Sequence, residues 1–188
     1  STAFSQRAAG AAGRRTNIEL VTQLTKLGGN GPIMANALAR LSIRVTYLGA
    51  LGYPNLHPVY QEFASRAEVH SITDPGHTNA LEFEDGKLML TKSSHFSEIT
   101  WPTIRERFGQ EKLLQELQSA DLIGFVNWTM IPYMSDVWEA ILEDVCPALQ
   151  GTRRMVFFDL ADPEKRTKED LQRALGLISR FTAHFNVT

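Results

Sequence analysis

The sequence has little of what would place it in several common classes of protein. Cys146 is the only cysteine among 188 residues, so no disulfide can form within the chain, and we expect a reducing compartment, the cytoplasm. No apolar run approaches the roughly 18 residues that a membrane span requires. The formal net charge is −2, which gives no bulk attraction for nucleic acid or for an anionic membrane. We therefore expect a globular protein that binds neither.

Several catalytic and metal-binding motifs are also missing. The histidines are scattered, and none is spaced from another histidine or from Cys146 as zinc ligands are. There is no Gly-x-Ser-x-Gly, which disfavours a serine hydrolase, and no Gly-x-x-x-x-Gly-Lys-Ser/Thr, which excludes a P-loop. Cys146 lies in an apolar, helical pattern, and we interpret it as a buried thiol and not as a nucleophile.

What the chain does have is an alternation of helical and strand-like patterns. Thr16-x-x-Glu19 forms a capping box before apolar residues at helical spacing. Strand–helix–strand units of this length predict right-handed crossovers, and hence an α/β fold in three layers, a mostly parallel sheet with helices on both faces. We expect one α/β domain over 1–188. The expected helices cover 16–27, 32–41, 57–67, 103–119, 134–149 and 168–181, and the expected strands 44–48, 69–72, 122–126, 155–158 and 184–187.

A β-hairpin is predicted inside this domain. Strand-like runs at 78–83 and 87–91 flank Glu84-Asp85-Gly86, and Asp-Gly between such runs is a strong hairpin signal. Because exposed strand edges are usually covered or paired, we expect this hairpin to pair with a second subunit in a homodimer. The alternative is a plain surface hairpin. The apolar face would consist of Leu81, Phe83, Leu88 and Leu90.

The segment Gly28-Gly29-Asn30-Gly31-Pro32 predicts a binding site at the start of a helix. The two glycines carry no side chains, so a ligand can approach the backbone closely. Pro32 suits the first helical turn, where its missing N–H is not needed. The free N–H groups and the positive end of the helix dipole suit hydroxyls or anions. The alternative is a helix C-cap followed by a turn.

Polar residues follow two of the predicted strands, at the edge of the sheet where open parallel sheets bind ligands. Asn127 offers donors and an acceptor, which suits sugar hydroxyls. Asp159 accepts hydrogen bonds, and Arg166 can pair with a carboxylate or phosphate. Trp128 either stacks on a ligand or belongs to the core, and the alternative for Asn127 is that it satisfies loop backbone only. We predict that Gly28, Gly29, Asn30, Asn127 and Asp159 gather in one pocket.

The Gly-Gly-x-Gly pattern, with Ala35, Ser42 and Gly52 after it, resembles the first signature of the ribokinase-like (PfkB) carbohydrate kinase family. Ile33 stands where that family usually has Asn. The segment from Asp159 to Arg166 resembles the family's Asp-Pro-Asn-x-Arg, with a longer spacing. The resemblance extends, more weakly, over most of the chain.

The resemblance implies an activity and roles for particular residues. The complete enzyme would use ATP and Mg²⁺ to phosphorylate a hydroxyl of a sugar or nucleoside. Gly28, Gly29 and Asn30 would contact substrate hydroxyls, Asn127 would contact a further hydroxyl, and Asp159 and Arg166 would form the pocket wall. The hairpin would be part of a lid over the sugar, with lid elements near 1–15 and 73–95.

Two parts of the family pattern do not occur in these 188 residues. One is an opening strand that ends in a sugar-binding Asp, and the other is a Gly-Ala-Gly-Asp-type segment that carries the catalytic base and an anion hole. We therefore expect the sugar-side portion of a kinase, with no catalytic residue of its own, the base lying beyond Thr188, and no activity alone. The rival interpretation is a non-catalytic sugar-binding or scaffold α/β domain.

Overall fold

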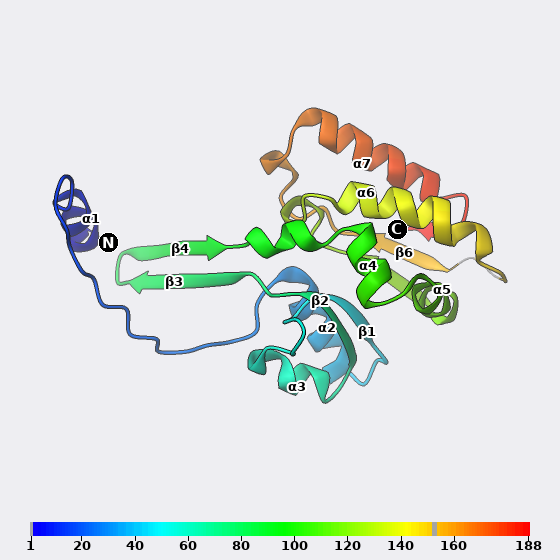
Figure 1. The fold of residues 1–188 in the computed structure, drawn as a ribbon, viewed down its shortest axis with the longest axis horizontal. Helices are drawn as coiled ribbons and strands as arrows, with labels where there is room; N and C mark the ends of the chain where they lie inside the picture. Colours follow the sequence, from blue (N-terminus) through cyan, green and yellow to red (C-terminus); the bar gives the residue numbers. More distant parts are fainter. Residues whose placement is uncertain (1, 152–153) are drawn as a thin grey trace.

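The structure, a computed structural model, describes residues 2–151 and 154–188. It is a mixed α/β fold in which parallel strands alternate with helices, as predicted (Figure 1). The helices are α1 (Thr2–Ala9), α2 (Asn30–Arg40), α3 (Gln61–Ala64), α4 (Trp101–Arg107), α5 (Gln110–Ser119), α6 (Met134–Ala140) and α7 (Lys168–Phe181). The strands are β1 (Thr46–Ala50), β2 (Glu68–Thr73), β3 (His77–Phe83), β4 (Gly86–Lys92), β5 (Leu122–Phe125), β6 (Met155–Phe158) and β7 (Asn186–Val187).

The parallel strands fall into two hydrogen-bonded sheets. One sheet consists of β1 and β2, and the other has the order β5-β6-β7. Within the described residues, no hydrogen bond joins β1 to β5, so each of these strands keeps one edge without a neighbouring strand.

The larger core lies between β5–β6–β7 and the helices α6 and α7, which Figure 1 shows along one side of β6. Alternate residues of β5 and β6 point to this side, and aromatic rings fill it. Phe158 packs edge-on against Trp138 at 4.9 Å between ring centroids and against Phe181 at 5.2 Å. On the opposite face, Leu122 and Met155 stay about half exposed.

Cys146 belongs to this core and is 1% exposed. Burial disfavours the charged thiolate and raises the pKa of the Cys146 thiol to about 11. The thiol is therefore protonated at neutral pH, which agrees with its interpretation as a buried, unreactive side chain.

The helix expected at 16–27 is wrong. Residues 16–28 have no regular secondary structure, and Leu20, Val21 and Leu24 are each more than half exposed. A capping box stabilises a helix start by only about 1 kcal/mol, and an isolated helix of this length is marginal in water. Of its apolar stripe only Leu27 packs against a described core cluster, so local preference alone does not make the segment helical.

Two longer predicted helices are interrupted. The one expected at 103–119 divides into α4 and α5 at Gly109, which has φ of 96°. The one expected at 134–149 stays α-helical only to Ala140 and then widens into a π-helical turn, Ile141–Val145. Pro147 follows this turn and lacks the N–H that a regular helix needs there. The helix expected at 57–67 is reduced to a 3₁₀ turn and the short α3.

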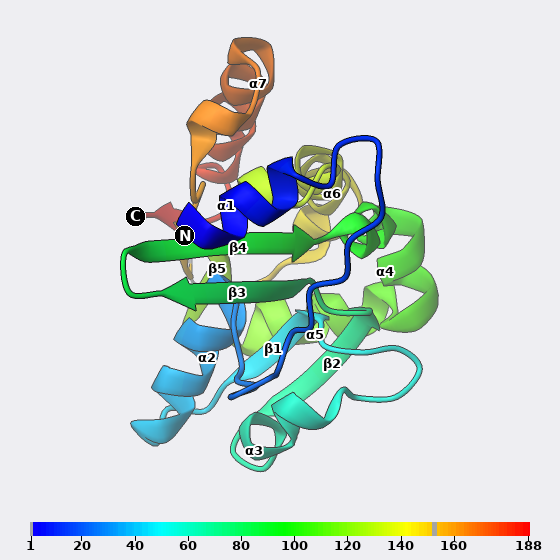
Figure 2. The same ribbon diagram turned by 90° about the vertical axis from the view of Figure 1, so that its left-hand side faces the viewer.

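The predicted hairpin is confirmed. Strands β3 and β4 pair antiparallel, with Leu81 opposite Leu88 and Phe83 opposite Gly86. The hairpin projects from the body of the molecule, and α1 lies beside its tip (Figures 1 and 2), where the Phe4 and Phe83 rings are 5.6 Å apart. Among the described residues, no helix is both long and apolar enough to cross a membrane.

Candidate functional site

The site is built around the first turn of α2. Gly29 has φ of 89° and ψ of 143°, which turns the chain into the helix, and the first helical bond runs from Ile33 N–H to the Gly29 carbonyl at 3.0 Å. Pro32 has no N–H. The N–H groups of Asn30 and Gly31 have no partner among the described residues, so they are free to meet a ligand.

Asp159 joins this turn to the ends of β5 and β6. Its carboxylate accepts hydrogen bonds from the Asn30 side-chain amide at 3.3 Å, from the Asn127 backbone N–H at 3.2 Å and from the Ala161 N–H at 2.7 Å. Its own N–H donates to the Phe125 carbonyl at 2.9 Å, which continues the parallel pairing of the two strands. Asp159 thus joins the end of β6 to Asn30, which lies 129 positions earlier in the sequence.

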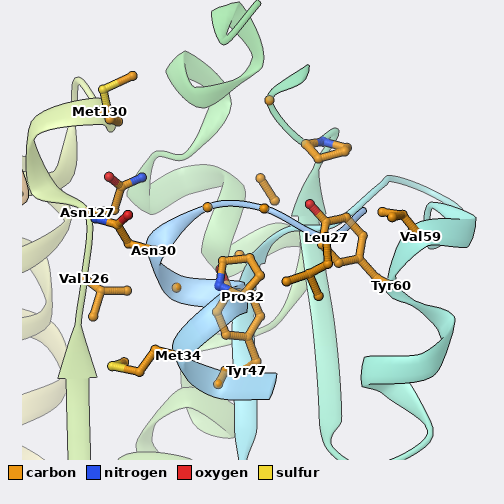
Figure 3. Close-up of a pocket in the computed structure, with 18 of the residues that line it drawn as sticks. Leu27, Asn30, Pro32, Met34, Tyr47, Val59, Tyr60, Val126, Asn127 and Met130 are labelled. Carbon is orange, nitrogen blue, oxygen red and sulfur yellow. The ribbon is translucent and has the colours of Figure 1, made fainter. Parts of the chain in front are cut away.

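Asn127 adopts a left-handed backbone conformation, with φ of 67° and ψ of 37°. Its side-chain amide makes no hydrogen bond within the part of the chain that the structure describes. Figure 3 shows this amide next to the side chain of Asn30, with Met130 above and Val126 below. The two amides together offer donors and acceptors to one ligand.

Four of the six predicted site residues line one cavity of about 2230 Å³, which continues between β1 and β5 toward the hairpin. These are Gly28, Gly29, Asn30 and Asn127. The volume exceeds the roughly 300–1,000 Å³ of an ordinary ligand pocket, so a small ligand would occupy only part of it. Asp159 does not line the cavity and supports it from behind.

Arg166 lies away from this cavity. Its guanidinium stacks over the ring of Trp128, 4.8 Å from the centroid, and donates to the Pro132 carbonyl at 3.1 Å. Trp128 is fully buried in the larger core, which agrees with the core interpretation of that residue. The structure thus does not bring Arg166 to the pocket wall that the sequence assigned to it.

Tyr47 is a cavity residue that sequence reasoning missed. Its side chain is partly buried beside α2, and burial, together with the nearby Tyr60, raises the pKa of its hydroxyl. A Cβ placed on Gly31 would lie 2.8 Å from the Tyr47 hydroxyl, and one on Gly49 would lie 2.7 Å from it. In the sequence, the signal for this position is the pair of glycines, Gly31 and Gly49, whose lack of side chains leaves room for the Tyr47 ring.

The described residues hold no cluster of the side chains that commonly bind metal ions. Within 2–151 and 154–188, no three His, Cys, Asp or Glu side chains gather closely enough to hold an ion. The donors at the cavity are amides and backbone N–H groups, which suit hydroxyls better than Mg²⁺.

Comparison with known proteins identifies the family. The family model described as prokaryotic ketohexokinase matches residues 2–188. A curated relative, a ketohexokinase from Haloferax volcanii, is 30% identical over 148 residues, which are 79% of this chain and 39% of the relative. The chain thus spans well under half the length of that relative. The chain therefore belongs to the prokaryotic ketohexokinase family, which consists of PfkB-type sugar kinases.

Proposed function

We propose that this chain provides the sugar-binding side of an enzyme that transfers the γ-phosphoryl group of ATP to a hydroxyl of a ketohexose. The observation that carries the proposal is the cluster of Asn30, Asn127 and Asp159 at the first turn of α2. The name of the Haloferax volcanii relative supports a ketohexose over other sugars and nucleosides.

The cluster suits a molecule with several neighbouring hydroxyls. Because the Asn30 amide donates to Asp159, its oxygen is left to accept from a sugar hydroxyl. The Asn127 amide is unpaired among the described residues and offers both a donor and an acceptor. Gly28 has open space around its Cα, so a sugar can lie directly against the backbone. Ile33 is about half exposed and offers no polar contact at this turn.

The test of this site is a calorimetric titration of the chain with D-fructose. We expect saturable binding by the unaltered chain, and a roughly tenfold or greater loss of affinity in Asn30→Ala, because a hydrogen bond to a hydroxyl and the Asp159 contact are both lost. Asn55→Ala is the control, because it removes an amide from a loop outside the cavity. Equal affinities in all three proteins would contradict the proposal.

The complete enzyme would require ATP, Mg²⁺ and a general base that this chain does not supply. The support is the sequence, which has no Gly-Ala-Gly-Asp-type segment. Losing a positioned base costs about 10²–10⁴-fold in rate, and losing the electrostatic clamp on the phosphoryl group costs more. We expect no ADP release above about 1 s⁻¹, the low end for kinases, when the chain is assayed with D-fructose and Mg-ATP. Faster turnover would show a catalytic apparatus within these residues.

The hairpin of β3 and β4 is proposed to be a lid that also joins two subunits. All residues of β4 are exposed, and the pairing places Leu81, Phe83, Leu88 and Leu90 on one face. An exposed strand with an apolar face favours pairing with another copy. We further propose a cytoplasmic location, which the lone, buried Cys146 supports.

A further inference from the structure

The position of the Asn127 side chain depends on an unusual backbone conformation. Residues other than glycine seldom adopt a positive φ, although Asn tolerates it better than most. The backbone at 127 is left-handed, and the conformation persists only where the surrounding structure holds it. The loop 127–133, which follows β5, must therefore be fixed on the side that faces away from the cavity.

Hydrogen bonds of Trp128 and Thr129 hold the first part of this loop in place. The Trp128 N–H donates to the Asp159 carbonyl at 3.2 Å, and its indole N–H donates to the Ser135 hydroxyl at 2.9 Å. The Thr129 hydroxyl donates to the Leu160 carbonyl at 2.6 Å. These bonds join the loop to α6 and to the segment after β6, and Arg166 provides a further contact to the Trp128 ring.

Arg166 reaches both ends of the loop. Its guanidinium lies over the Trp128 ring, near the start of the loop, and donates to the Pro132 carbonyl near the end. The side chain is only 16% exposed, and its Nε lies 3.6 Å from the Asp170 carboxylate, too far for a strong ion pair. The stacking and the carbonyl contact therefore fix its place more than the Asp170 charge does.

We propose that Arg166 is a positioning residue: it closes the loop 127–133 around Trp128 and thereby holds the Asn127 amide at the cavity. The inference rests on the proposed function, because the amide matters only if a sugar binds there. A planar guanidinium can stack its face on a ring while its N–H groups donate within its own plane, which a lysine ammonium does not do. The role is thus specific to arginine and not to positive charge.

The first experiment needs no ligand. Backbone and side-chain amide signals of Asn127 are recorded by ¹⁵N NMR in Arg166→Ala, Arg166→Lys, Asp170→Ala and Arg180→Ala. Arg180 pairs with the exposed carboxylates of Glu139 and Glu143, away from the loop, and is the control. We expect both Arg166 variants to shift the Asn127 signals and the other two to leave them unchanged. Unshifted Asn127 signals in Arg166→Lys, which keeps the charge and most of the side-chain volume, would overturn the proposal even if Arg166→Ala fails to fold.

The second experiment measures the consequence for the sugar. With D-fructose as the probe, we expect the Arg166 variants to bind roughly twofold to thirtyfold more weakly, the range that a cation–π contact supports. Unchanged affinity in a folded Arg166 variant would overturn the positioning role. If the unaltered chain binds no fructose, the proposed function fails, and the Asn127 signals still decide whether Arg166 holds the loop.

Discussion

At the scale of single residues, Asp159 explains why the site forms where it does. Its carboxylate satisfies two backbone N–H groups and the Asn30 amide. The sequence predicts Asp159 as a polar residue at the end of a buried strand. It does not predict the three hydrogen-bond donors of its carboxylate, since these depend on how the end of β5, the loop after β6 and the start of α2 come together. Asp159 thus acts as the support of the site, and the ligand contacts come from the amides that it orients.

Gly28 and Gly29 allow a matched test of backbone conformation. Gly29 has φ of 89°, a Cβ there would lie 3.4 Å from Pro32 Cδ, and Gly28 has open space and no positive φ. We expect Gly29→Ala to lower the free energy of unfolding by about 1–3 kcal/mol, because a non-glycine residue is strained there. Gly28→Ala should be neutral or slightly stabilising. Urea unfolding measures both, and equal effects at the two positions would contradict the assigned conformation.

At the scale of elements, two that pack in the larger core follow the sequence pattern closely, whereas the segment 16–27 departs from it entirely. Strand β6 and helix α7 match their predicted bounds, because each buries an apolar face in the larger core. The segment 16–27 has an equally regular helical pattern but leaves most of its apolar side chains exposed. Local pattern therefore predicts an element only when the rest of the fold provides its partner.

The hairpin gives the prediction that belongs to this scale. Changing Leu88 and Leu90 together to Ser should shift the protein toward monomer in light scattering over micromolar concentrations, with little loss of stability, because the two residues are already 39% and 46% exposed. Met89→Ser is the control, since Met89 pairs with Ala80 on the other face of the hairpin. A protein that is monomeric before any substitution would remove the dimer from the account.

At the scale of the whole molecule, the class of fold could be predicted from the sequence, but the division into two sheets and the cavity between them could not. The alternation of patterns predicts parallel α/β structure, and the strand-end rule predicts that Asn127 and Asn30 meet. The division into two sheets, with a large cavity between the open edges of β1 and β5, depends on long-range packing that no local pattern encodes. The same holds for Arg166, whose partners Trp128 and Pro132 are set by the fold and not by spacing.

The central claim is that the first turn of α2 and the end of β5 bind a ketohexose. The most direct measurement is a ¹⁵N NMR titration of the chain with D-fructose, in which the amide signals report each position separately. We predict that the largest saturable shifts occur at Asn30, Gly31 and Asn127, and that they vanish in Asn30→Ala. Saturable shifts confined to residues outside the cavity, or no shifts at all, would contradict it.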